Sequence, residues 1–198
     1  RFLVVTGSKV TTNYNPVDPG ISELQLDMGV RLPLLDPDET PSHVDGQNPM
    51  ASHAVKLPVK LEDGRLGFKT ALVGRGQDVQ EGYLPFTREN IVLQAFKFLG
   101  ERYGWGHSYN ARDCTGLVLD VYRTFGILLP RNSSQQGTSG IGANTRFSKS
   151  ATDGDRLEAL ARARVGDLLY SPGHVMIFLG EDDDDPYVIH DMSGSGWV

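Results

Sequence analysis

The sequence contains a single cysteine, Cys114, so an internal disulfide bond is impossible. No apolar run approaches the roughly 20 residues that a membrane-spanning helix requires. Basic residues are not in excess either, because 19 Lys and Arg stand against 25 Asp and Glu, which gives a net charge of −6. That balance argues against a nucleic-acid-binding protein. We therefore expect neither a nucleic-acid partner nor a transmembrane segment in this chain.

The sequence also lacks an initiator methionine at its start, Arg1, and shows no signal-peptide pattern there. We expect it to be the processed or ordered part of a longer product, in which an export signal would lie outside this chain. What is present is typical of a globular protein: 39% of the residues are hydrophobic and 22% are charged.

The first of two expected domains covers residues 1–85. Its segments are short, with β-like patterns separated by turn residues, and the Glu-Asp-Gly turn at 62–64 predicts a hairpin. Pro33 restricts the segment 30–35 to an edge strand. Several short strands without a helical period favour a small β-barrel.

The second expected domain covers residues 86–198. Thr87 can cap a first helix, and a second helix is predicted over 114–125. Strands are predicted near the end of the chain, over 165–170, 174–179 and 187–190. Helices first and a sheet last indicate an α+β domain.

Cys114 is predicted at the start of the second helix, after a glycine-rich and aromatic loop that includes Tyr103 and Trp105. The partial positive charge of a helix N-terminus stabilises a thiolate. Cys114 is therefore a candidate nucleophile, with a buried structural thiol as the alternative.

A nucleophilic cysteine needs a base, and that base needs an orienting partner. His174 begins an apolar strand and His190 ends the next one, and in an antiparallel hairpin these two positions are neighbours. The pair is a candidate base and orienting group. The alternatives are two unrelated histidines, or a zinc site formed with Cys114.

Several segments with a joint spacing resemble the NlpC/P60 cysteine peptidases over about residues 87–193. They are Asp113-Cys114-Thr115-Gly116-Leu117-Val118, Leu129-Pro130-Arg131-Asn132-Ser133-Ser134-Gln135-Gln136, Gly173-His174-Val175-Met176-Ile177-Phe178-Leu179-Gly180 and Tyr187-Val188-Ile189-His190. Residues 1–85 resemble, more weakly, the bacterial SH3-like domain that often precedes this peptidase. The resemblance implies a small SH3-like barrel followed by a papain-like α+β domain.

The resemblance also implies a role for each site residue. Cys114 is the nucleophile, His174 the base and His190 the polar third residue. The Tyr103 hydroxyl binds the oxyanion beside the Cys114 amide. Independently of the resemblance, Trp105 is expected in the wall of the substrate cleft, where it would bind substrate, or in the core. No metal or other cofactor is implied.

Two positions depart from the family pattern: Thr115 stands where serine is commoner, and His107 where glycine is commoner. His107 either narrows the cleft or adds a titrating group. Asp113 and Thr115 are implied to receive a free α-ammonium of the substrate. The alternative for Asp113 is a helix cap.

The function implied by the resemblance is hydrolysis of peptidoglycan stem peptides between γ-D-glutamate and diaminopimelate or lysine, with a preference for a free N-terminal L-alanine. The expected location is the cell envelope or periplasm, or the cytoplasm in a recycling role. The alternatives are another papain-like amidase or acyltransferase, because the triad alone does not name the acyl group, and a catalytically silent wall-binding protein.

Overall fold

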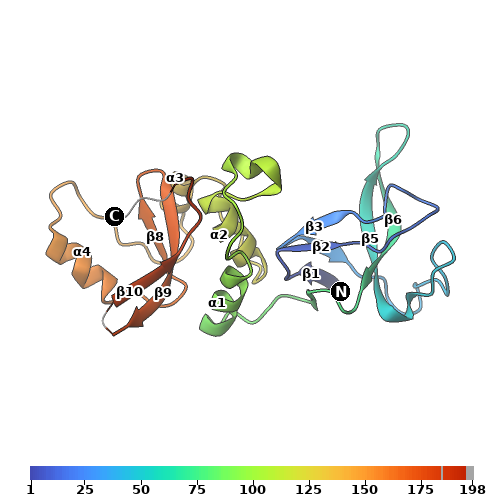
Figure 1. The fold of residues 1–198 in the computed structure, drawn as a ribbon, viewed down its shortest axis with the longest axis horizontal. Helices are drawn as coiled ribbons and strands as arrows, with labels where there is room; N and C mark the ends of the chain where they lie inside the picture. Colours follow the sequence, from blue (N-terminus) through green and yellow to red (C-terminus); the bar gives the residue numbers. More distant parts are fainter. Residues whose placement is uncertain (184, 195–198) are drawn as a thin grey trace. The chain divides into compact units, whose positions relative to one another are not determined.

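The computed structural model describes residues 1–183 and 185–194, and in it the chain forms two compact units (Figure 1). Unit 1 comprises Arg1–Pro85 together with Arg123–Gly126, and unit 2 comprises Phe86–Tyr122 together with Ile127–Val198.

Unit 1 consists of short antiparallel strands arranged in three separate sheets. The strands are β1 (Phe2–Val5), β2 (Lys9–Thr11), β3 (Gln25–Asp27), β4 (Arg31–Pro33), β5 (Ser52–Lys60), β6 (Leu66–Gly74) and β7 (Val79–Glu81), with a 3₁₀ turn over Pro49–Ala51. One sheet has the order β4-β1-β7, and the pairs β2-β3 and β5-β6 form the other two. The strand that contains Pro33 lies at an edge, which confirms the prediction for that segment.

The hairpin predicted around the Glu-Asp-Gly turn is confirmed. β5 pairs with β6 along the whole length of both strands, from Ser52 opposite Gly74 to Lys60 opposite Leu66. Gly64 has a φ of 82°, the left-handed conformation that tight turns require and that glycine adopts without strain. The inner half of the hairpin, which is the half distant from the turn, contributes Val55 and Val73 to the core of unit 1. Both residues are fully buried.

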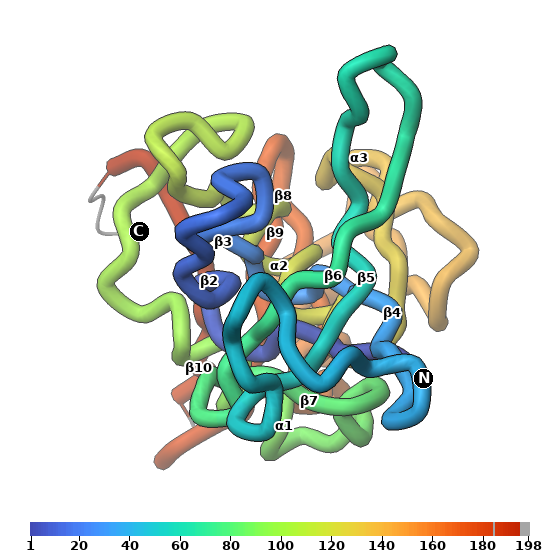
Figure 2. Tube along the Cα trace, turned by 90° about the vertical axis from the view of Figure 1, so that its right-hand side faces the viewer, coloured from blue at the N-terminus to red at the C-terminus, as the bar shows by residue number. Residues whose placement is uncertain are grey.

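The SH3-like barrel expected for residues 1–85 is not confirmed, because the strands described in this unit do not close into a barrel. The outer half of the β5–β6 hairpin shows the physical reason. Leu66 and Phe68 are 69% and 59% exposed, so this half packs against no further strand. Figure 2 shows the hairpin extending away from the other strands of its unit.

Unit 2 begins with helices whose start points follow local sequence signals. The helices are α1 (Arg88–Phe96), α2 (Cys114–Arg123), α3 (Ser133–Gln136) and α4 (Asp153–Leu160). The predicted cap of α1 is confirmed, since the Thr87 hydroxyl accepts a hydrogen bond from the Asn90 N–H. α4 starts with a capping box between Thr152 and Asp155.

An antiparallel sheet in the order β10-β9-β8 completes unit 2. Its strands are β8 (Leu168–Ser171), β9 (His174–Asp182) and β10 (Asp185–Ile189). Val175 and Ile177 on β9 are fully buried, as are Val118 and Val121 on α2, so the helix and the central strand both contribute to the hydrophobic interior. The unit has the mixed α and β content predicted for residues 86–198. None of the helices described is long and apolar enough to cross a membrane.

Candidate active site

Cys114 is the first residue of α2, as the sequence predicts. Its side chain is a free thiol, and only 8% of the residue is exposed. The first turn of a helix carries unpaired N–H groups and a partial positive charge. The thiol therefore lies where a thiolate, or an oxyanion beside it, is stabilised by the backbone.

Asp113 caps the helix that Cys114 begins. Its Oδ1 accepts hydrogen bonds from the Gly116 N–H at 2.8 Å and from the Thr115 hydroxyl at 3.0 Å. Its Oδ2 accepts from the Gly106 N–H at 3.0 Å and from Arg131 Nη2 at 2.6 Å. Because two carboxylate oxygens offer about four acceptor positions, the protein itself already occupies this carboxylate.

Arg131 is the cation of this cluster, and the sequence analysis assigned it no role. It comes from the loop after α2, and its Nη1 donates to the Thr115 hydroxyl. Burial alone would raise the pKa of Asp113, but the hydrogen bonds from Arg131, Gly116 and Gly106 outweigh it and lower that pKa below the ordinary value. In the sequence, the one indication of a role for Arg131 was its position directly after Pro130 in the segment 129–136.

His174 and His190 are brought together, as the hairpin argument predicts. His174 is the first residue of β9, and His190 directly follows β10. His174 Nε2 lies 2.8 Å from His190 Nδ1, and the two rings meet edge to face at 77°. Burial, and then the neighbouring His190, lower the pKa of His174. His174 is therefore a neutral imidazole at neutral pH, as a general base must be.

Tyr103 lies within electrostatic range of Cys114. Burial raises the pKa of the Tyr103 phenol, and the charges of Asp113, Cys114 and Asp191 raise it further. The hydroxyl therefore stays protonated at neutral pH and can donate a hydrogen bond. A backbone bridge to Arg112, two residues before Cys114, fixes this segment beside the start of α2.

Asp191, which the sequence analysis did not single out, lies within electrostatic range of Asp113, the residue before α2. It follows His190 directly, and its charge acts on Tyr103. Burial, followed by the charges of Asp113 and Glu101, raises the pKa of Asp191 to about 6. The histidine end of β10 therefore lies close to the N-terminus of α2.

The loop that carries Trp105 is held in an unusual backbone conformation. His107 and Tyr109 have φ values of 66° and 59°, in the left-handed region that non-glycine residues rarely adopt. The His107 imidazole packs over Gly116 so closely that a Cβ at Gly116 would overlap it. Trp105 is 80% exposed, so it is not a core residue.

The zinc alternative finds no support in the part of the chain that the structure describes. No three side chains of His, Cys, Asp or Glu are gathered there so as to hold a metal ion. The arrangement consists instead of a thiol at a helix N-terminus, an imidazole pair and a protonated phenol, which are groups suited to nucleophilic acyl chemistry.

Comparison with known proteins supports this description. The model of the NlpC/P60 family matches residues 100–196. Over 189 residues the chain is 24% identical to a gamma-D-glutamyl-L-lysine dipeptidyl-peptidase of Bacillus cereus, a match that covers 91% of this chain and 47% of that protein. Over 97 residues it is 29% identical to dipeptidyl-peptidase 6 of Lysinibacillus sphaericus, covering 48% of this chain and 30% of that protein. The chain thus spans less than half the length of either relative.

Two solved structures share the fold. An NlpC/P60 endopeptidase from Photobacterium damselae subsp. piscicida superposes with a TM-score of 0.67 at 22% identity, over 95% of this chain and 40% of that chain. An NlpC/P60 family protein from Bacillus cereus gives 0.55 at 19% identity, over 96% of this chain and 57% of that chain. The family match therefore shows that this chain contains an NlpC/P60 family domain, and the two structures show that it shares their fold.

Proposed function

We propose that this chain is a cysteine peptidase of the bacterial cell envelope that hydrolyses peptidoglycan stem peptides at the bond between γ-D-glutamate and a diamino acid. The observation that carries the proposal is the 2.8 Å contact between His174 and His190, in the same unit as Cys114, which begins α2. The bond is suggested by the relative described as a gamma-D-glutamyl-L-lysine dipeptidyl-peptidase.

The reaction proceeds by acyl transfer through Cys114. His174 takes the thiol proton, and the sulfur attacks the γ-carbonyl carbon of the glutamyl residue. The C–N bond then breaks, and His174 gives the proton to the leaving amine of the diamino acid. Water, deprotonated by His174, hydrolyses the thioester and restores the thiol.

The contact between the histidines supports Nδ1 of His174 as the ring nitrogen that acts as the base. His174 Nε2 faces His190, so Nδ1 is the nitrogen left for the thiol. Nδ1 is a base only when Nε2 carries the proton, and that N–H then donates to His190 Nδ1. His190 therefore selects the productive tautomer of His174 and holds its ring orientation.

The developing oxyanion is stabilised by two donors. One is the backbone N–H of Cys114 in the first turn of α2, which has no partner within the helix. The other is the Tyr103 hydroxyl, whose raised pKa keeps its proton available. Both donors belong to segments fixed by backbone hydrogen bonds, so little reorganisation is needed when charge develops.

We also propose a preference for peptides with a free N-terminal L-alanine. Both curated relatives are described as dipeptidyl-peptidases, enzymes that release dipeptides from a free amino end. The ammonium would be received at Asp113 and Thr115, where it shares the single carboxylate charge with Arg131. Because Arg131 already neutralises most of that charge, acetylating the alanine should lower kcat/KM by only about tenfold.

Mass spectrometry of stem peptides with a free N-terminal L-alanine, incubated with the purified chain, tests the proposal. We expect release of L-Ala-γ-D-Glu, with turnover reduced at least about a thousandfold in Cys114→Ala and His174→Ala. His190→Ala should keep part of the activity, because it orients the base rather than reacting. His43→Ala is the matched control, an exposed histidine of unit 1 that should leave the rate unchanged.

Two results would reject this function. Cleavage by Cys114→Ala at the wild-type rate would show that Cys114 is not the nucleophile. Intact stem peptides with a free N-terminal L-alanine, combined with turnover of other amides or transfer of an acyl group to an added amine, would favour the amidase or acyltransferase alternative.

A further inference from the structure

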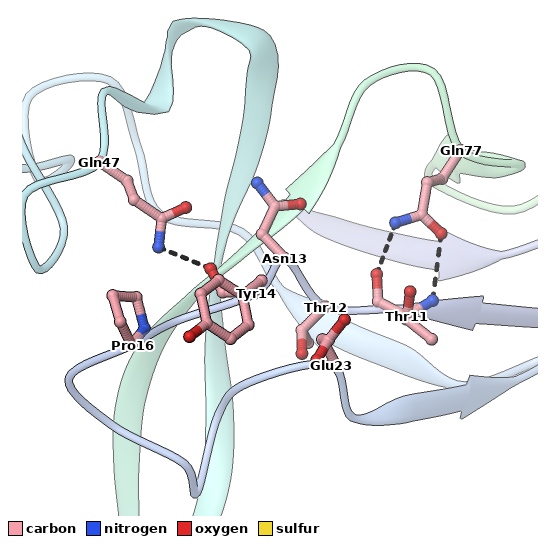
Figure 3. Close-up of a pocket in the computed structure, with 8 residues that line it drawn as sticks. All are labelled: Thr11, Thr12, Asn13, Tyr14, Pro16, Glu23, Gln47 and Gln77. Carbon is pink, nitrogen blue, oxygen red and sulfur yellow. Dashed lines mark hydrogen bonds between the residues drawn. The ribbon is translucent and has the colours of Figure 1, made fainter.

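Unit 1 contains a groove of about 590 Å³ that has no part in the proposed peptidase reaction (Figure 3). It lies where the chain leaves β2 and turns back toward β3. Its walls are contributed by four segments that are distant in the sequence. The lining residues are Thr11, Thr12, Asn13, Tyr14, Pro16, Glu23, Gln47 and Gln77.

The walls of the groove are fixed by hydrogen bonds to the backbone. Gln77 accepts from the Thr11 N–H at 3.1 Å and donates to the Thr11 carbonyl at 2.6 Å. Gln47 donates to the Tyr14 carbonyl at 2.9 Å, which ties the loop after β4 to the other wall. Thr12, at the floor, is buried and bonds to the Ile21 carbonyl at 2.7 Å. The groove is therefore preorganised, which lowers the entropy cost of binding a ligand.

Two side chains stand out as available to a ligand. The Tyr14 side chain carries a large apolar ring, yet the residue is 63% exposed. Glu23 is exposed, and its φ of 50° is a left-handed conformation that costs a non-glycine residue about 1 kcal/mol. In the view of Figure 3 the ring of Tyr14 lies between Pro16 and the carboxylate of Glu23. The groove thus presents both an exposed aromatic ring and a strong hydrogen-bond acceptor.

The charge of the lining narrows the class of ligand. No lysine or arginine lines the groove, and Glu23 is its one carboxylate. A phosphate, a teichoic-acid-like polymer or a peptide rich in carboxylates would be repelled. The remaining polar groups are neutral hydroxyls and amides, which can both donate hydrogen bonds to hydroxyl groups and accept hydrogen bonds from them. The volume lies in the range of small-molecule sites.

We propose that this groove binds an uncharged saccharide. A sugar ring presents an apolar C–H face, which can stack on the Tyr14 ring. Its hydroxyls can donate to the Glu23 carboxylate and exchange hydrogen bonds with the amides of Asn13 and Gln47. Naming the glycan strand of peptidoglycan as the source of the sugar rests on the proposed function, whereas saccharide binding itself does not.

Isothermal titration calorimetry of the full chain with a tetramer of β-1,4-linked N-acetylglucosamine tests the proposal. We expect saturable binding that weakens at least tenfold in Tyr14→Ala and is restored in Tyr14→Phe, which keeps the ring. Glu23→Gln should weaken it about threefold by removing the charge from the acceptor. Phe68→Ala is the matched control, an aromatic residue of the same unit that is 59% exposed outside the groove and should change nothing.

The outcomes separate the ligand classes. No saturable binding of the tetramer, or equal loss in Tyr14→Ala and Phe68→Ala, would overturn the proposal. Tighter binding of trilysine than of the sugar would also overturn it, in favour of an ammonium site. Cellotetraose, which lacks the acetamido groups, should bind more weakly if the source is wall glycan; equal affinity would support a general saccharide site. The sugars contain no peptide bond, so failure here leaves the peptidase proposal untouched.

Discussion

Replacing Asp113 removes the group that joins the start of α2 to two other segments. In Asp113→Ala the buried Gly116 N–H loses its acceptor, which costs roughly 1–3 kcal/mol. Arg131 loses its carboxylate partner as well. Because the Arg131 side chain is 42% exposed and can be solvated, breaking this ion pair costs much less stability than breaking a fully buried pair. We expect the free energy of unfolding to fall by about 2–4 kcal/mol.

The matched control is Asp153→Ala in the same unit. Asp153 forms a 2.8 Å ion pair with Arg156, but its side chain is 94% exposed. An exposed pair of this kind contributes about 0.5 kcal/mol or less. Urea unfolding followed by far-ultraviolet circular dichroism measures both variants against the wild type. Equal losses in the two variants would refute the argument that burial makes the Asp113 network strong.

The effect of Asp113 should also depend on pH in a defined direction. Its pKa is lower in the folded protein than in the unfolded chain, so ionised Asp113 stabilises the fold above the unfolded value of about 4. That contribution is lost as the pH falls through the lower, folded pKa. The stability difference between wild type and Asp113→Asn should therefore be constant near neutral pH and shrink below about pH 4. A difference that grows in acid would show that the network acts through something other than the carboxylate charge.

Three further predictions concern neighbouring residues. Because the pKa of His174 is lowered, its base form persists into mild acid, and a pH profile of kcat/KM should fall only below about pH 6.5, the ordinary value for histidine. The pKa of Asp191 is raised to about 6, so its ionisation above that pH opposes folding. Asp191→Asn should therefore be more stable than wild type by about 1–2 kcal/mol at pH 7.5 and equally stable near pH 4, as urea titrations would show. Gly116→Ala should lower the free energy of unfolding by about 1–3 kcal/mol, because the added methyl group crowds His107. Combining it with His107→Gly in a double-mutant cycle should recover most of that loss. Strictly additive effects of the two substitutions would contradict the contact.

Local signals in the sequence were sufficient for the elements and for much of the candidate site. Thr87 and Asp113 cap helices, the Glu-Asp-Gly turn closes a hairpin, and each depends only on residues a few positions away. The meeting of His174 and His190 was also predictable, since an antiparallel hairpin places the start of one strand beside the end of the next. Such patterns involve residues close together in the chain, so they can be interpreted without knowing how distant segments pack.

Only the tertiary structure decided which partners these residues meet. Nothing in the residues around Asp113 indicated that Arg131, from beyond the helix, would occupy both its carboxylate and the Thr115 hydroxyl. Likewise, alternation within each strand of unit 1 could not show whether the strands would close into a barrel. Strand pattern fixes the two faces of a strand, whereas closure and long-range ion pairs depend on how separate segments pack together.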